Sequence, residues 1–272
     1  MKQAGILVAA AAFAAAAPLT AGEIEAEGLL DLPEADVVIL GEVHDNPLHH
    51  AHQTLATQAV GAEAIVFEML TDAEARRVTP ELLADEDRLR EALGWEDKGW
   101  PDFAWYYPIF TAVENPAVYG GDLGRQTIRR AVREGAAAVL GPSAGIFDLD
   151  EPLPEDQQGR REREQAAAHC NALPETLLPG MVEAQRLRYA ALARAVIAAH
   201  AETGGPVVVV TGNGHARNDW GIPHALARAA PQLDVISVAQ FEEDAPADPP
   251  YDYWLVTDPA PRPDPCEAFE NR

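Results

Sequence analysis

Residues 37–46 read Val37-Val38-Ile39-Leu40-Gly41-Glu42-Val43-His44-Asp45-Asn46, so a short apolar run passes directly into a polar cluster. β-branched residues dominate the run, which is typical of a buried strand. The glycine that follows lets the backbone turn sharply. The pattern therefore predicts a β-strand whose carboxyl end carries a carboxylate and an imidazole.

Two further apolar runs end in the same way. Ala64 to Phe67 leads into Glu68, and Val207 to Val210 leads into Thr211-Gly212-Asn213-Gly214-His215-Ala216-Arg217. The full set of strand patterns is Val37 to Leu40, Ala64 to Leu70, Ala117 to Tyr119, Pro206 to Thr211, Val235 to Phe241 and Tyr251 to Thr257. The last of these follows a Pro-rich loop, and we expect it to be an antiparallel edge strand.

Helical patterns separate these runs. Leu48 to Val60 follows Pro47, a favourable first-turn residue, with Asn46 available as a cap. Alternating strands and helices predict an α/β fold with a mostly parallel sheet flanked by helices. In such a sheet the carboxyl ends of the strands meet at one rim, and ligands bind in the crevice there.

Two longer segments are expected to add helices as a cap beside the sheet. The first, 71–115, includes a helix that opens at Pro80 and runs toward Leu93. The second, 155–201, is expected to break near Pro174 and again near Pro179.

Length, charge and the N-terminal residues limit the classes of protein. Residues 1–21 combine Lys2 with an alanine-rich run and small residues up to Ala21, a pattern that predicts a cleaved signal peptide and a periplasmic or secreted protein. The remaining residues, 22–272, suit one domain. The formal net charge of −24 argues against a nucleic-acid partner and against an anionic membrane surface, since both require clustered Lys and Arg.

The chain has two cysteines, Cys170 and Cys266. Two separate buried thiols are one interpretation, and a disulfide is the other. An exported compartment favours the disulfide, which would close a long loop and stabilise the fold by roughly 4 kcal/mol in the chain-entropy model.

Glu42, His44, Glu68 and His215, with Arg217 beside them, are the candidate catalytic residues at the rim. The two imidazoles and two carboxylates could bind a divalent metal ion and activate water. They could instead form a metal-free acid/base set with shifted pKa values. A buried polar network that only holds loops together is the third interpretation.

Other histidines and motifs are weaker candidates. His49 is expected to point at the rim, and His50 and His52 are expected on a solvated helix face. Gly141 to Gly145 matches a nucleophile-elbow pattern but lacks the following helix. Trp105-Tyr106-Tyr107-Pro108-Ile109-Phe110 is the densest aromatic stretch, which either packs in the core or exposes a tyrosine that binds haem iron.

These clusters, in this order, resemble the ChaN-like haem-binding-uptake family of the Tiki superfamily. The matching stretches are Gly41 to Asn46 with His49, His50 and Gln53, then Phe67 to Met69, Trp105 with Tyr107 to Ile109, His169-Cys170, Ala184-Gln185 with Arg188, and Gly212 to Arg217 through Gly221 to Pro223. The chain departs from the family pattern at Tyr189, where an aspartate is usual, and at Leu192, where a methionine is common.

The resemblance implies an exported protein that binds haem and serves haem or iron uptake. It also implies haem held at a homodimer interface through a tyrosine, with histidine nearby. By resemblance, the candidate haem-binding residues are Tyr107, Tyr189, His49, Asn46, Gln53 and Arg188. The wider superfamily implies the alternative of a metal-assisted hydrolase that uses Glu42, His44, Glu68 and His215.

Overall fold

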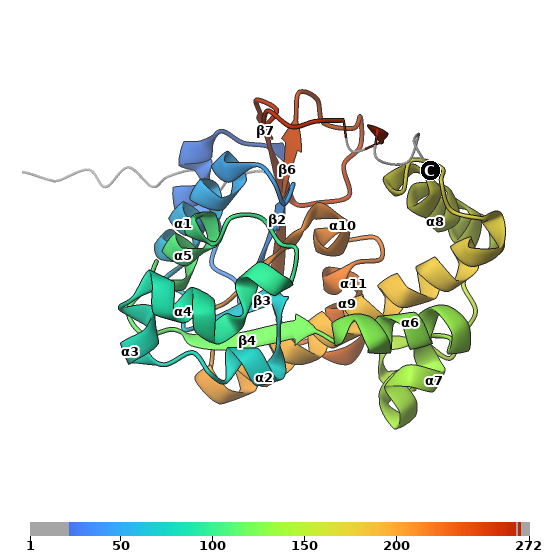
Figure 1. The fold of residues 1–272 in the computed structure, drawn as a ribbon, viewed down its shortest axis with the longest axis horizontal. Helices are drawn as coiled ribbons and strands as arrows, with labels where there is room; N and C mark the ends of the chain where they lie inside the picture. Colours follow the sequence, from blue (N-terminus) through green and yellow to red (C-terminus); the bar gives the residue numbers. More distant parts are fainter. Residues whose placement is uncertain (1–21, 265, 268–272) are drawn as a thin grey trace, which may run out of the picture.

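A computed structural model describes residues 22–264, 266 and 267, and its seven strands form a single parallel sheet (Figure 1). The strand order is β1-β7-β6-β2-β5-β3-β4. The strands are β1 (Gly22–Glu23), β2 (Val37–Glu42), β3 (Ala64–Thr71), β4 (Ala117–Asp122), β5 (Val207–Gly212), β6 (Val235–Glu242) and β7 (Tyr253–Thr257). The predicted α/β class is confirmed. The predicted signal peptide, 1–21, lies outside the described residues.

Helices occur in the predicted segments 48–60, 71–115 and 155–201 and also outside them, at 124–134, 136–140, 213–216 and 222–229. They are α1 (Pro47–Val60), α2 (Asp72–Ala75), α3 (Pro80–Leu83), α4 (Glu86–Leu93), α5 (Phe103–Phe110), α6 (Gly124–Glu134), α7 (Ala136–Leu140), α8 (Glu155–Ala168), α9 (Leu178–Thr203), α10 (Asn213–Ala216) and α11 (Ile222–Ala229). Short 3-10 turns η1 (Ala26–Asp31), η2 (Trp95–Asp97), η3 (Gly141–Phe147) and η4 (Glu175–Leu177) complete the chain.

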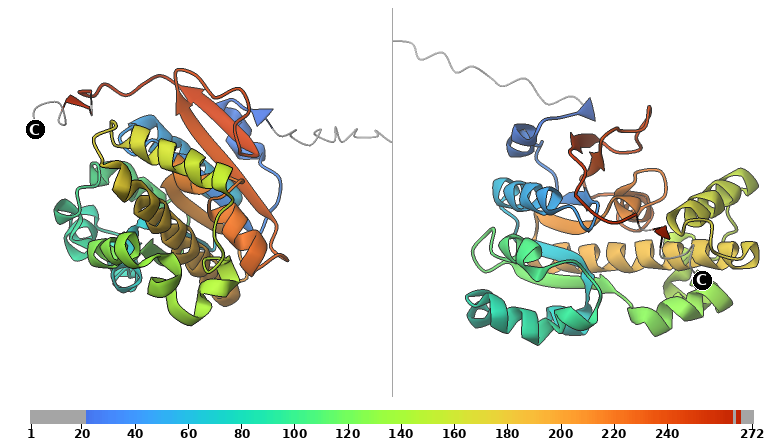
Figure 2. Two further views of the ribbon diagram at one scale, coloured as in Figure 1. Left: turned by 90° about the vertical axis from the view of Figure 1, so that its right-hand side faces the viewer. Right: turned by 45° about the horizontal axis from the view of Figure 1, so that its top comes forward.

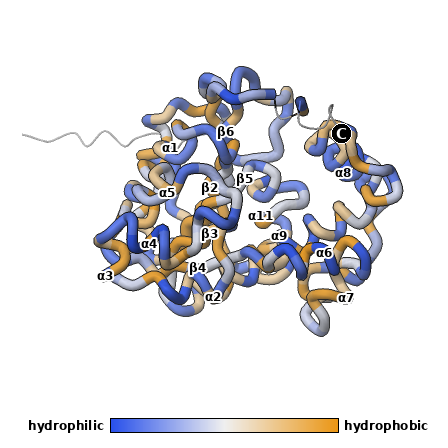
Figure 3. The backbone as a smooth tube through the Cα atoms, in the orientation of Figure 1, coloured by the Kyte–Doolittle hydropathy of each residue, from blue (hydrophilic) through white to orange (hydrophobic). Residues whose placement is uncertain are grey.

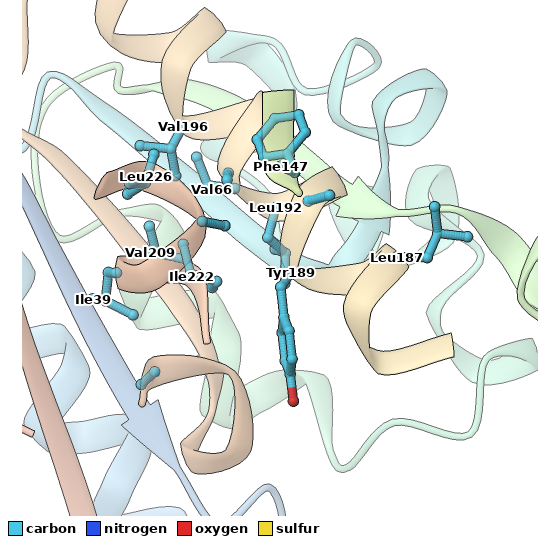
Figure 4. Close-up of a cluster of buried hydrophobic side chains, with 14 of the residues drawn as sticks. Ile39, Val66, Phe147, Leu187, Tyr189, Leu192, Val196, Val209, Ile222 and Leu226 are labelled. Atoms are coloured by element: carbon cyan, nitrogen blue, oxygen red, sulfur yellow. The ribbon is translucent and has the colours of Figure 1, made fainter. Parts of the chain in front are cut away.

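Helices cover both faces of the sheet, because side chains of each buried strand alternate between two apolar cores. Val38 and Leu40 of β2 face the core beneath α1 and α5. Val37 and Ile39 face the core beneath α9 and α11 (Figure 4). Figure 3 shows hydrophobic residues along the central strands and hydrophilic residues at the outer turns. The central strands are therefore buried on both sides, as parallel strands must be.

The connections that leave β2 and β5 diverge at the rim. The two strands are neighbours in the sheet. The chain leaves β2 through α1 toward β3 on one face, and leaves β5 through α10 and α11 toward β6 on the other. Neighbouring strands whose connections diverge in this way leave an opening at their carboxyl ends, where α/β proteins bind ligands.

The segment 155–201 divides into two parts with different roles. Its last helix, α9, is the longest in the described chain and packs on β3, β4 and β5, so it belongs to the layer that covers the sheet. Helix α8 packs on α9, and α6, α7 and α8 form a lobe at one end of that helix (Figures 1 and 2).

Three details of the predicted elements were wrong. Strand β7 is parallel to β6 instead of antiparallel. The Pro-rich connection 243–252 runs back along β6, so that β7 begins beside Val238 and runs in the same direction. The helix predicted from Pro80 to Leu93 divides into α3 and α4, since the Asp85 side chain accepts a hydrogen bond from the Arg88 N–H and caps α4. Pro179 does not break a helix, because it lies in the first turn of α9, where no N–H is required.

The predicted disulfide is confirmed. Cys170 follows α8, and Cys266 lies near the C-terminus, so the bond ties the C-terminal segment to the helical lobe across a sequence separation of 96 residues. In the chain-entropy model, a closed loop of this length removes much of the freedom of the unfolded chain.

We predict that replacing both cysteines (C170A/C266A) lowers the free energy of unfolding by about 2 to 4 kcal/mol, because the unfolded chain regains that freedom. Urea unfolding followed by circular dichroism measures the change. A loss below about 1 kcal/mol would show that the bond constrains little of the unfolded chain.

Candidate functional site

Glu42 is the last residue of β2, and its carboxylate is buried at the rim of the sheet. Oε1 accepts hydrogen bonds from His44 Nδ1 at 2.6 Å and from the Tyr106 hydroxyl at 2.8 Å. Oε2 lies 3.3 Å from His50 Nδ1. Burial alone would raise the pKa of Glu42, but hydrogen bonds and charge from His44 and His50 outweigh it and lower the pKa to about 2. The carboxylate is therefore ionised at neutral pH.

Glu68 supplies the second buried carboxylate. It lies within β3, where the register with β4 is irregular between Phe67 and Thr71. Such irregularities re-aim side chains at strand ends. Oε2 accepts hydrogen bonds from the Thr211 hydroxyl at 2.7 Å and the Gly212 N–H at 2.8 Å, and Oε1 lies 3.1 Å from His215 Nε2. Burial would raise the pKa of Glu68, but the neighbouring imidazoles and donors hold it well below its usual range.

His44 lies between the two carboxylates. Burial would lower its pKa, but the hydrogen bond to Glu42 and then the charge of Glu68 raise the pKa to about 9. The imidazole edge contacts the Trp100 ring at a centroid distance of 4.9 Å, and the side chain stays 36% exposed. A Cβ at Gly212 would lie 2.9 Å from His44 Nε2, so only glycine lets this ring approach β5. The rim therefore carries an accessible imidazolium at neutral pH.

The four predicted rim residues thus form two carboxylate–imidazole pairs, Glu42 with His44 and Glu68 with His215. The described residues contain no group of three or more His, Cys, Asp or Glu side chains placed to hold a metal ion. The carboxylate oxygens instead receive hydrogens from imidazole, phenol, hydroxyl and amide groups. The metal-binding and catalytic roles of these residues stay predictions.

Arg217 and Tyr189 lie beside the second pair. The Tyr189 ring meets the His215 ring edge-on, with centroids 5.3 Å apart. The Arg217 guanidinium lies over the Trp220 ring at 3.7 Å and forms ion pairs with Asp219 and Glu164. Arg217 is thus turned toward α8 and the loop before α11, whereas the Tyr189 ring contacts His215.

Three predicted haem-binding residues make buried structural contacts. His49 Nδ1 accepts from the Val43 N–H, and its Nε2 donates to the Thr257 hydroxyl at 2.8 Å. Asn46 caps α1 and donates to Glu242 at 2.7 Å. Gln53 donates to the Leu40 carbonyl at 3.0 Å. These contacts hold α1 against the sheet.

His50 differs from the expected solvated residue. It is fully buried, and its Nε2 donates to the His44 carbonyl at 2.8 Å, because α1 turns this residue toward the core between Trp105 and Tyr106. His52, also expected to be solvated, is half-buried and shares a hydrogen bond of 2.8 Å with Gln240.

Helix α5 contributes Tyr106 to the site, although the sequence did not mark this residue as a candidate. Tyr107 donates its hydroxyl to the Leu83 carbonyl at 2.8 Å, whereas Tyr106 reaches Glu42. A helical signal existed, since Phe103, Tyr106 and Phe110 recur at the spacing of one helix face and are all buried. Thr211, whose hydroxyl donates a hydrogen bond to Glu68, was also not among the predicted site residues.

A pocket of 490 Å³ lies next to the His44 side of the rim. Trp100, which contacts His44, forms part of its wall. Its charged lining residues are Lys98, Arg125, Arg129 and Arg188 with Glu74, Asp97 and Asp122, and Lys98 pairs with Glu74. Arg188, predicted to contact a cofactor, therefore lies in a pocket of mixed charge that reaches the Trp100 side of His44.

We predict that the His44 imidazole titrates near pH 9 and that E42Q lowers this pKa, because Gln removes the negative charge that stabilises the imidazolium. The folded-state pKa lies above the ordinary value of about 6.5, so the stability that protonated His44 contributes is complete below that pH and is lost as pH rises through about 9. NMR titration of the ring Cε1–H measures it. A midpoint at or below about 6.5 in the unsubstituted protein would contradict the assignment.

We predict that G221A destabilises the protein by about 2 kcal/mol or more, because a Cβ there would overlap the backbone carbonyl oxygens of His215 and Arg217. Gly214 is the matched control, since a Cβ at that position meets no atom within 4 Å. G214A should change the free energy of unfolding by less than about 0.5 kcal/mol. Urea unfolding measures both changes. Equal losses of unfolding free energy in the two variants would show that the backbone does not pack closely against Gly221.

Comparison with known proteins supports the family resemblance. Residues 29–226 match the sequence profile of the family described as "Haem-binding uptake, Tiki superfamily, ChaN". A similar solved structure is "Cofacial heme binding to ChaN of Campylobacter jejuni", with a TM-score of 0.63 and 20% sequence identity over 84% of this chain and 89% of that chain. The type III effector HopBA1 has a TM-score of 0.45 and 13% identity over 86% of this chain and 91% of its own. The search of curated proteins finds no match.

The Campylobacter structure shares the fold at low sequence identity, and the profile match spans more than half of the chain. The chain belongs to the haem-binding uptake (ChaN) family of the Tiki superfamily.

Proposed function

We propose that this chain is an exported haem-binding protein that serves haem or iron uptake. Its family and the solved ChaN structure, which concerns haem binding, support the ligand. The Cys170–Cys266 disulfide supports an oxidising compartment such as the periplasm, where such bonds persist. Within the described residues, no helix is long and apolar enough to cross a membrane.

The hydroxyl of Tyr189 is the observation that carries this proposal. Tyr106, Tyr107, Tyr119 and Tyr251 donate their hydroxyls to acceptors elsewhere in the chain. The Tyr189 hydroxyl has no hydrogen-bond partner among the residues that the structure describes, and Figure 4 shows it pointing away from the apolar cluster that holds the ring. A phenol oxygen in this position suits a ligand for haem iron.

Charge near Tyr189 favours this role. Burial raises the pKa of the Tyr189 hydroxyl to about 12, while the positive charges of Arg161 and Arg217 act in the opposite direction. Iron binding replaces the phenol proton, so nearby guanidinium groups stabilise the resulting phenolate. Bound haem would supply the iron, and this chain would supply the phenolate and the cations around it.

Two other features suit the rest of a haem molecule. Trp100 presents an aromatic surface beside His44, and the neighbouring pocket carries Arg125, Arg129 and Arg188, whose charges favour a negatively charged ligand. His44 itself is protonated below about pH 9, and a protonated imidazole cannot bind iron. We therefore assign His44 to charge and hydrogen bonding near the ligand, and Tyr189 to the iron. The homodimer expected from the family resemblance stays a prediction.

We predict that the purified protein shifts the Soret band of equimolar haemin and that Y189F weakens haemin binding by about tenfold or more, because the iron loses its phenolate ligand. Y107F is the matched control, since that hydroxyl donates to the Leu83 carbonyl, and its affinity should stay within about twofold.

Two results would contradict the proposal at different levels. Absence of any Soret shift in the unsubstituted protein would reject haem binding itself. Weaker binding by Y107F with unchanged binding by Y189F would keep haem as the ligand but reject the assigned tyrosine.

A further inference from the structure

Arg161 of α8 has a buried guanidinium without a counter-ion. The residue is 7% exposed, and its Nε is enclosed without a hydrogen-bond partner. Among the described residues it forms no ion pair, and its guanidinium lies over the Trp220 ring at 4.9 Å. This arrangement is unusual because buried arginines are almost always paired.

Burial does not remove the charge of Arg161. It lowers the pKa of the guanidinium only to about 10, so the group stays a cation at neutral pH. A buried charge without a partner is costly, and a bound anion would offset that cost. The uncompensated cation therefore points to a ligand of opposite charge.

Within the described residues, no carboxylate pairs with Arg161. Glu151, which lines the same cavity, forms no ion pair with a described residue, and four other carboxylates pair with other arginines. The ion pairs are Asp148 with Arg228 at 2.5 Å, Glu183 with Arg186 at 2.7 Å, Glu164 with Arg217 at 3.1 Å and Asp219 with Arg217 at 2.8 Å. Arg161 is left over in a chain that carries 44 acidic and 20 basic residues. Scarcity of acidic side chains does not explain its isolation.

Arg161 lines a cavity of 370 Å³ between η3, α8, α9 and α11. Phe147, Leu149, Ala190 and Ala225 form apolar parts of the wall, and the polar and aromatic parts come from Arg186, Arg228, Tyr189, Trp220 and His224, with two carboxylates, Asp148 and Glu151. Burial and then the charges of Arg161 and Arg228 lower the pKa of His224. The imidazole thus reports a positive potential in this cavity.

We propose that this cavity binds the carboxylate of a small organic molecule and that Arg161 is the residue that holds it. A guanidinium offers a planar edge of N–H donors that matches the two oxygens of a carboxylate. The Arg161 guanidinium carbon lies 4.9 Å from the centre of the Trp220 ring, and its Nε is enclosed, so the terminal N–H groups are the donors left for a ligand. The apolar wall accommodates a short carbon chain, and a volume of 370 Å³ suits a small ligand or the end of a larger one.

Two sources share this chemistry, a free short-chain carboxylic acid and a propionate side chain of haem. Tyr189 lines the same cavity, so haem held through its hydroxyl would bring a propionate within reach of this wall. The haem source rests on the proposed function, whereas the free acid does not.

The test titrates sodium propionate into the oxidised, full-length protein against sodium chloride at equal ionic strength. We expect propionate to raise the melting temperature and the pKa of His224, followed by NMR of its ring, because a bound anion cancels the positive potential. R161M should weaken propionate binding by about tenfold or more. It should also melt at a higher temperature than the unsubstituted protein without ligand, since it removes an unpaired buried charge.

Arg160 is the matched control. It neighbours Arg161 in α8 and also lies near the Trp220 ring, at 5.2 Å, but it is exposed. R160M should bind propionate within about twofold of the unsubstituted protein. R161K keeps the positive charge but lacks the planar pair of N–H donors that matches a carboxylate. Its affinity for propionate should lie between those of R161M and the unsubstituted protein, which separates carboxylate recognition from a folding defect.

Haemin and haemin dimethyl ester, which lacks free carboxylates, distinguish the two sources. If R161M weakens haemin but not the ester, the site holds a haem propionate. If R161M weakens only propionate, the site takes a free acid. Propionate binding without any haemin binding rejects the proposed function and supports this site. The proposal is overturned if propionate leaves the His224 pKa and melting temperature unchanged, or if R160M and R161M lose equal affinity.

Discussion

Two ionised carboxylates inside the protein constrain the rim of the sheet. A buried carboxylate without donors is costly, so Glu42 and Glu68 each require several hydrogens from other segments. Glu42 receives them from the loop after β2 and from α5, with α1 close by. Glu68 receives them from β5 and lies against α10. Segments far apart in the chain therefore meet at one place, and the site depends on both charges.

These contacts also determine what the rim presents to a ligand. Because Glu42 and Glu68 stabilise its proton, His44 presents a cation at the rim. Because Glu68 fixes His215, the His215 ring can support the edge of Tyr189. Arg161 and Arg217 then place positive charge around the Tyr189 hydroxyl. This acidic protein thus places positive charge near His44 and the Tyr189 hydroxyl, which supports the proposal of an anionic ligand.

The fold and the four rim residues could be predicted because both depend on local patterns. Apolar runs that end in polar residues mark strand ends, and parallel strands bring those ends together. The direction of β7 could not be predicted, since it depends on where a Pro-rich connection leads the chain. Which tyrosine of α5 reaches Glu42 depends on how this short helix is rotated about its axis. The Tyr106 hydroxyl donates to Glu42, whereas that of Tyr107, one residue later, donates to the Leu83 carbonyl.

The burial of His50 was missed for a related reason, because α1 faces the core along a wider stripe than its polar residues indicate. The isolation of Arg161 leaves no trace in the sequence. Glu164 is three residues away and could have paired with it, yet in the fold Glu164 pairs with Arg217. The missing partner of a charged group becomes visible only when all neighbouring charges have been placed.

The most direct test of the account is resonance Raman spectroscopy of the ferric haem complex, because it reports the bond between iron and a phenolate oxygen. Phenolate bands are expected for the unsubstituted protein and for Y107F, and they should be lost in Y189F. A spectrum without phenolate bands, or one that Y189F leaves unchanged, would contradict the claim that Tyr189 holds the haem iron.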